Sequence, residues 1–248
     1  MKLVKMKSAL PITEYAPTWD ISFGAGRSED TEMLDSIKKW LIDNEQMIVD
    51  KFPVNNDGGT GLGDQSVTSR YGQYNLFNFA DQCPELEKLL EFFRITYLKF
   101  ISKDNTPIKP CDIVCWYNIL RPGEEIKGHF HGAGHDAYLS GNMHFDNYDT
   151  VTFYRNPFDH NVWFPAKNLK GGCTVFPSYV WHKTDEYKGT DLRVSVAFDL
   201  HVKQGGMWPS LKADALQATP FIDDQILNQI NLKYPNLAKE SSNDIYYC

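Results

Sequence analysis

Three histidines are the residues of this chain best suited to bind a metal ion. His129 and His131 end the run 114–131, which we expect to form an apolar strand, a turn and a returning strand. Side chains at i and i+2 of a strand project from the same face, so both imidazoles can reach one ion. His182 is the best later candidate for a third ligand. Together these residues predict a mononuclear metal site.

An arginine that follows the third histidine could hold an anion beside that metal. In the run 192–202, apolar residues take one strand face, while Arg193, Ser195 and Ala197 take the other. A guanidinium matches a carboxylate in bidentate fashion, and a neighbouring hydroxyl can donate a further hydrogen bond. This small polar face predicts a site for a dicarboxylic acid.

The identity of the third ligand has three readings. His131 binds the metal in a three-histidine site, or Asp136 supplies a carboxylate, or His129 and His182 bind alone and water completes the site. We favour the first, because the i, i+2 spacing already aims both rings at one point. Neutral imidazoles leave more positive charge at the metal than a carboxylate would, which suits a dianionic co-substrate.

Length and composition predict an ordinary soluble protein. The chain has 248 residues, 42% hydrophobic and 14% aromatic, enough for one domain with a sizeable core. A net charge of -7 argues against broad binding to nucleic-acid backbones. Five cysteines without CxxC pairs predict a reducing, cytoplasmic location, and no signal peptide or membrane-spanning run is visible.

The elements that must position these residues follow from periodicity. Apolar residues recurring every three or four positions predict helices at 31–49, 84–101 and 223–232. Short β-rich runs broken by Pro, Gly, Asn and Asp predict an antiparallel sandwich or barrel. Its candidate strands are 112–121, 124–131, 137–145, 150–155, 173–182 and 192–202.

The chain is therefore expected to be mainly β with flanking helices. We interpret it as a single domain, 1–248. It has an N-terminal helical elaboration at 1–110, a β core at 111–203 and a C-terminal extension at 204–248.

The spacing around the histidines carries a family resemblance. Gly123 stands six residues before His129, and the pair His129 and His131 stands where other proteins have His-x-Asp. Downstream come His182 and then Arg193-x-Ser. This pattern, over residues 111–203, resembles the prolyl 4-hydroxylase-like 2-oxoglutarate/Fe(II)-dependent oxygenases. The variant His-x-His is similar to a branch of oxygenases that includes phage-encoded members.

The resemblance implies a double-stranded β-helix core, jelly-roll or cupin-like, that binds Fe(II) and 2-oxoglutarate. It implies that Arg193 and Ser195 hold the far carboxylate of 2-oxoglutarate, and Asn118 is assigned to the co-substrate with them. The implied activity is that of a dioxygenase, most often a hydroxylase, which consumes 2-oxoglutarate and O₂. The primary substrate is open, with a peptide or small molecule favoured over nucleic acid.

A second motif competes for the metal. His144-Phe145-Asp146 is a literal His-x-Asp, but it lies only 38 residues before His182. Tyr138 also stands where the family pattern has glycine. We therefore expect this motif to bind no metal.

Two other functions compete with the oxygenase. The first is a cupin-type metalloenzyme that does not use 2-oxoglutarate, for which three histidines are suitable but Arg193-x-Ser195 is unnecessary. The second is a virion-associated or interaction module that has kept the fold and lost the chemistry, which the absence of bound metal would indicate.

Overall fold

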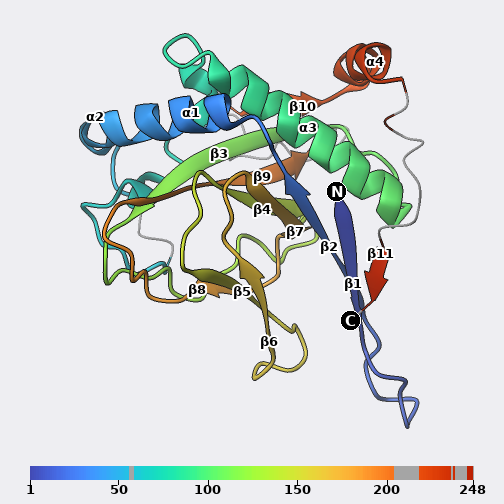
Figure 1. Ribbon diagram of the computed structural model, residues 1–248. Helices are drawn as coiled ribbons and strands as arrows, with labels where there is room; N and C mark the ends of the chain where they lie inside the picture. The colour runs from blue at the N-terminus through green and yellow to red at the C-terminus, as the bar shows by residue number, and fades with distance from the viewer. Residues whose placement is uncertain (56–58, 204–217, 236, 238–244, 248) are drawn as a thin grey trace.

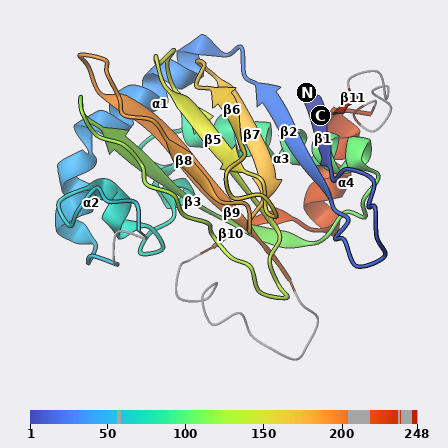
Figure 2. The same cartoon turned by 90° about the horizontal axis from the view of Figure 1, so that it is seen from below.

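Two β-sheets and a layer of helices make up the structure, a computed structural model that describes residues 1–55, 59–203, 218–235, 237 and 245–247. Figure 1 shows the helices above the large sheet and the small sheet below it. Figure 2, from below, shows the small sheet in front of the large one. The large sheet is therefore covered on both faces.

The large sheet contains eight strands in the order β10-β3-β9-β4-β7-β2-β1-β11. Its neighbours are antiparallel except for the parallel pair β1 and β11. Its strands are β1 (Lys2–Lys7), β2 (Asp20–Arg27), β3 (Cys111–Leu120), β4 (Leu139–His144), β7 (Gly172–Pro177), β9 (Arg193–Val202), β10 (Thr219–Ile222) and β11 (Ile245–Tyr247).

The small sheet has the order β6-β5-β8, formed by Trp163–Lys167, Val151–Arg155 and His182–Thr184. From β3 to β9 the chain crosses repeatedly between the two sheets, and both ends of this segment pair in the large sheet. Such alternation between two facing antiparallel sheets is the arrangement of a jelly roll. The expected double-stranded β-helix core, mainly β with flanking helices, is confirmed.

The expectation of a strand at 124–131 is wrong. This segment is a loop that touches the small sheet through one isolated bridge between His129 and His182. Gly123 has φ 87° and turns the chain, and Gly128 lies against the Trp181 ring. Hydrogen bonds to other loops replace a regular ladder, since the Lys127 N–H donates to the Thr60 carbonyl at 2.9 Å.

The strand expected at 173–182 is also wrong in its extent. β7 ends at Pro177, and β8 begins at His182 in the other sheet. Between them the Val180 N–H donates to the Pro177 carbonyl at 2.9 Å, which closes a turn. The sequence pattern does not reveal this crossing, because β7 and β8 are both half-buried.

The helices pack on the outer face of the large sheet. The helix expected at 31–49 is two helices, α1 (Thr31–Asp43) and α2 (Glu45–Lys51), separated at Asn44. α3 (Glu85–Asp104) ends at Asn105, whose left-handed φ of 57° stops it. Its Phe93 ring lies 4.6 Å from the ring of Phe198 in β9.

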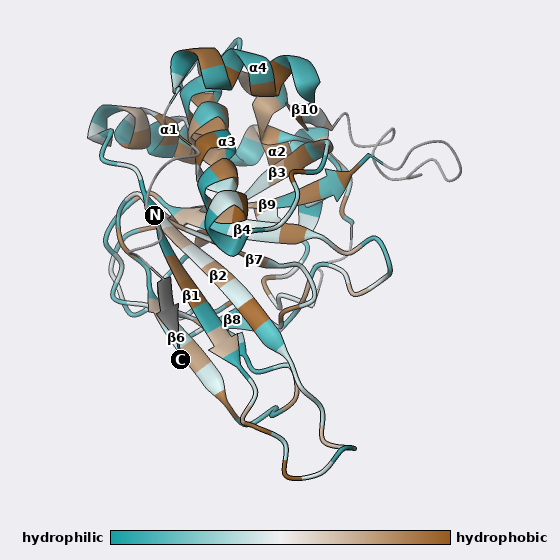
Figure 3. Cartoon of the chain, turned by 90° about the vertical axis from the view of Figure 1, so that its right-hand side faces the viewer, coloured by the Kyte–Doolittle hydropathy of each residue, from teal (hydrophilic) through white to brown (hydrophobic). Residues whose placement is uncertain are grey.

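The termini add strands and a helix to this core. β1 and β2 form an antiparallel hairpin that extends the large sheet beside β7, within the segment 1–110 that was expected to be a helical elaboration. α4 (Asp224–Lys233) matches the helix expected at 223–232. In Figure 3, α1, α3 and α4 lie together on one side of the strands.

Four of the five cysteines lie among the described residues. Cys83, Cys111, Cys115 and Cys173 are free and buried, and Cys248 lies outside the part of the chain that the structure describes. None of the described helices has the length and apolar character needed to cross a membrane.

Candidate active site

A cavity of about 170 Å³ lies between the two sheets. The large sheet contributes side chains from β3, β4 and β9, and the small sheet contributes Thr152 and the β8 residues 182–184. Thr60, Thr68 and Tyr71 reach it from the segment between α2 and α3, in which Val67–Arg70 form a short 3-10 helix. All six residues predicted to bind the metal or the co-substrate line this cavity.

The three predicted metal ligands meet at this cavity. His129 and His131 come from the loop before β4, and His182 begins β8. Each offers one ring nitrogen, and the three nitrogens lie within 4.8 Å of one another. Two backbone hydrogen bonds between His129 and His182, of 3.1 and 2.9 Å, hold the loop to the small sheet. The cluster therefore forms without the strand that was expected to carry it.

The hydrogen bonds of the rings fix which nitrogen is free. Nδ1 of His129 lies 2.9 Å from the Lys127 carbonyl, and Nδ1 of His182 lies 3.0 Å from the Val180 carbonyl. A carbonyl oxygen only accepts, so each Nδ1 carries the proton and donates. In the neutral rings Nε2 is then left with its lone pair, as a metal requires.

Burial favours the neutral form of two of these rings. It lowers the pKa of His129 to about 4, with a further contribution from the neighbouring His131. Burial likewise lowers the pKa of His182 well below its ordinary value, helped by the other two histidines. Both rings are therefore unprotonated at neutral pH, and no proton has to leave before a cation binds.

Asp199 is a site residue that the sequence reasoning missed. Its carboxylate accepts from His131 Nδ1 at 2.6 Å and from Ser140 Oγ at 2.6 Å. Burial raises the pKa of this carboxyl, but His131 and Ser140 hold it below its usual range. The signal was available, since the polar face of β9 that carries Arg193 and Ser195 continues to position 199.

Arg193 is buried at the same cavity. Its side chain is 1% exposed, and Nε donates to Thr150 Oγ1 at 3.1 Å. Nη1 has no hydrogen-bond partner among the described residues. Burial lowers the pKa of Arg193 to about 10, although the Tyr148 ring, 6.0 Å away, and Asp185 oppose this shift. A buried cation with a free donor is ready for an anion.

Ser195 and Asn118 face each other across β9 and β3. Both are buried and line the cavity, and Asn118 Oδ1 accepts from Thr68 Oγ1 at 2.9 Å. His144 of β4 pairs with Ser195 on its other side and also lines the cavity. The wall of the cavity beside Arg193 is thus built from three adjacent strands.

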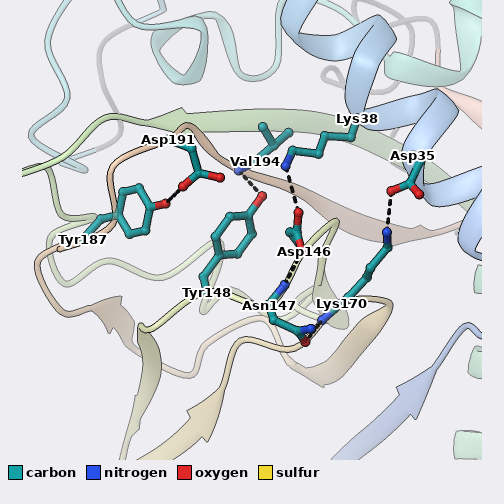
Figure 4. Close-up of polar contacts among 9 residues, drawn as sticks. All are labelled: Asp35, Lys38, Asp146, Asn147, Tyr148, Lys170, Tyr187, Asp191 and Val194. Atoms are coloured by element: carbon teal, nitrogen blue, oxygen red, sulfur yellow. Dashed lines mark hydrogen bonds and ion pairs between the residues drawn. The ribbon is translucent and has the colours of Figure 1, made fainter.

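The two polar side chains of the competing motif have different surroundings. Asp146 turns toward α1, where its carboxylate accepts from Lys38 Nζ at 3.0 Å (Figure 4). His144 stays in the cavity beside Arg193, and its buried Nδ1 has no partner within the described residues. Asp136 is exposed, and the histidine cluster does not include it.

A family model matches part of this chain. Residues 114–199 match the family described as "Putative 2OG-Fe(II) oxygenase". A search of curated proteins gives no match.

Solved structures of similar shape include a Pseudomonas putida prolyl-4-hydroxylase, at 11% identity and a TM-score of 0.47. That match covers 73% of this chain and 93% of the other. A Trichoplax adhaerens prolyl hydroxylase in complex with a hypoxia inducible factor peptide matches at 9% identity and a TM-score of 0.47, covering 73% and 83%. A non-heme alpha ketoglutarate dependent epimerase from nogalamycin biosynthesis matches at 10% and 0.45, covering 83% and 91%.

The family match covers the residues that form the cavity. It begins in β3 and ends in β9, so it includes the three clustered histidines, Arg193 and Asp199. The part of the chain that is similar to this oxygenase family is therefore the β core that surrounds the cavity, residues 114–199 of the 248.

Proposed function

We propose that this chain is an Fe(II)- and 2-oxoglutarate-dependent hydroxylase in which His129, His131 and His182 bind the iron. The observation that carries the proposal is the convergence, in one cavity, of three imidazoles and a buried guanidinium whose Nη1 has no hydrogen-bond partner among the described residues. Imidazoles suit iron, and three ligands leave other positions open for exogenous groups. Bound Fe(II) would supply the activation of O₂ that such enzymes couple to the loss of CO₂ from 2-oxoglutarate.

The chain's own residues orient the co-substrate. Arg193 would donate to its distal carboxylate through the free Nη1, while Nε stays on Thr150. Ser195 and Asn118 lie on neighbouring strands of the same cavity wall, where they can donate further hydrogen bonds. Three neutral imidazoles add no negative charge, so a dianion compensates both the metal and the arginine.

The primary substrate would enter past aromatic side chains. Phe130, 41% exposed, contacts Trp181 with ring centroids 5.1 Å apart, and it lines the cavity. Lys183 also lines the cavity, and its Nζ lies 4.8 Å from the Trp163 ring. Such a wall accepts the apolar part of a peptide or small molecule and offers it a cation.

The buried arginine distinguishes the oxygenase from its competitors. A cupin-type enzyme without 2-oxoglutarate gains nothing from Arg193, whose burial opposes its charge. A non-catalytic module would have no reason to keep three imidazoles with their Nε2 lone pairs free. An oxygenase would use both the buried arginine and the three imidazoles, which favours it over the two alternatives.

The test is an anaerobic titration of the metal-free protein with Fe(II), followed by 2-oxoglutarate. We expect one Fe(II) per chain and one 2-oxoglutarate that binds tightly only to the iron-loaded protein. Iron binding without 2-oxoglutarate binding would indicate the cupin-type enzyme, and binding of neither would indicate the non-catalytic module.

The same titration decides between the candidate third ligands. Asp136→Asn should leave iron affinity unchanged, because this side chain is exposed and lies outside the histidine cluster. Loss of iron in this variant would instead identify Asp136 as a carboxylate ligand.

A further inference from the structure

We infer that Asp199 is a positioning residue for the metal, acting through His131. In this inference, which rests on the proposed function, the carboxylate missing from the His-x-His motif is present one contact further out. It orients the ring of His131 and places a negative charge behind the third ligand. A metal-ligating imidazole commonly donates its second N–H to a carboxylate in this way.

The contacts fix both the tautomer and the orientation of this ring. His131 Nδ1 lies 2.6 Å from Asp199 Oδ1, and a carboxylate accepts, so Nδ1 donates and Nε2 is left for the metal. The rings of Trp116 and Phe176 lie 5.3 and 6.4 Å from the imidazole. The His131 side chain is 7% exposed, so it has little room to turn.

Asp199 differs from the partners of the other two rings. His129 and His182 donate to backbone carbonyls, which carry no net charge. Among the three, His131 alone donates to a carboxylate. It is also the histidine that stands where the family pattern has aspartate. The negative charge that the motif lacks in sequence is therefore supplied behind the His131 ring, one contact further from the metal.

The sheet holds the carboxylate in place. Asp199 lies opposite Ser140 in the pairing of β9 with β4, and the Ser140 hydroxyl donates to the same oxygen at 2.6 Å. Asp199 forms no ion pair with a lysine or arginine of the described residues, and its carboxylate accepts hydrogen bonds from His131 and Ser140. A largely buried carboxylate is costly unless it is compensated, and a metal bound through His131 would compensate it.

The first test measures metal affinity and ring geometry without turnover. We expect Asp199→Asn to weaken Co(II) binding, used as an air-stable probe of the Fe(II) site, by about 10- to 100-fold. Nitrogen-correlated NMR of the metal-free protein should show the His131 ring losing its fixed Nδ1-protonated tautomer. Asp112→Asn is the matched control, since Asp112 lies in the same sheet and pairs with Lys203 at the surface.

The second test asks whether Asp199→Asn changes Co(II) affinity in opposite directions in the parent and in His131→Asp. His131→Asp places two carboxylates against each other, so removing the charge of Asp199 should then help. We expect the double variant His131→Asp/Asp199→Asn to bind Co(II) more tightly than His131→Asp alone, although Asp199→Asn weakens binding in the parent. A merely structural role for Asp199 would weaken binding in both backgrounds.

The outcomes separate this inference from the proposed function. Unchanged Co(II) affinity in Asp199→Asn, or weaker binding of the double variant than of His131→Asp, overturns the role of Asp199 alone. Failure of the parent to bind Co(II) or Fe(II) overturns the proposed function and this inference together.

Discussion

Replacing Arg193 by methionine should abolish tight 2-oxoglutarate binding without destabilising the metal-free protein. The guanidinium is 1% exposed, and no carboxylate of the described residues forms an ion pair with it. Burial lowers its pKa from 12.5 to about 10. At about 1.4 kcal/mol per pKa unit, burying the charged guanidinium lowers the free energy of unfolding by roughly 3 kcal/mol. An apolar side chain of similar length removes that cost.

When 2-oxoglutarate is bound, the arginine becomes favourable and its replacement costs free energy of binding. A distal carboxylate facing Arg193 would be left buried without its partner in the variant, a loss on the order of 3 to 5 kcal/mol. A factor of ten per 1.4 kcal/mol makes this at least about a hundredfold weaker binding. Arg193→Lys should recover part of the affinity, because an ammonium supplies the charge without the bidentate fork. Iron affinity should not change in either variant.

Two measurements check this prediction. Calorimetric titration of the anaerobic Fe(II) protein gives the 2-oxoglutarate affinity, and thermal unfolding of the metal-free protein gives the stability. Arg27→Met is the control, because Arg27 is half-exposed and lies in β2, which does not line the cavity. A metal-free Arg193→Met protein with a lower melting temperature and unchanged 2-oxoglutarate affinity would make Arg193 a structural residue and refute the reasoning.

Two further predictions concern the histidines. His129→Ala or His182→Ala should abolish stoichiometric Fe(II) binding, measured by metal analysis, because a site with two remaining ligands competes poorly with buffer. The control variant Asp146→Ala should retain the iron. Full iron occupancy in His182→Ala would contradict the proposed ligand set. Burial lowers the pKa of His144 well below its usual value, helped by Arg193, so the unfolded chain binds a proton that the folded chain does not. Stability should therefore fall as the pH drops below about 6.5, by up to about 1.4 kcal/mol per pH unit for this proton. Urea unfolding of the metal-free protein should show a shallower pH dependence in His144→Asn, and identical slopes would contradict this account.

Local patterns in the sequence were sufficient to predict the two faces of β9. The alternation in 192–202 predicted one apolar face and one polar face, and β9 has both. Val194 and Val196 lie in the core under the helices, while Arg193 and Ser195 line the cavity. Because successive side chains of a strand point to opposite faces, this division needs no knowledge of distant contacts.

The histidine cluster was predictable for a different reason. His129 and His131 lie two residues apart, so even a loop keeps them close, and their rings lie 5.4 Å apart without a strand to carry them. Long-range pairing brings His182 to them, through the bridge with His129. The residue types and spacing were enough to identify the candidates, although the local structure expected around them was wrong.

The sequence by itself thus determined which side chains could do chemistry and which face of β9 carries them. Only the tertiary structure decided their partners. Asp199 is 68 residues from His131, and Thr150 is 43 residues from Arg193. Periodicity reports the local direction of a side chain, whereas such contacts depend on how strands pair and on which loops cross between the sheets. That pairing also directed Asp146 to Lys38 and left His144 in the cavity.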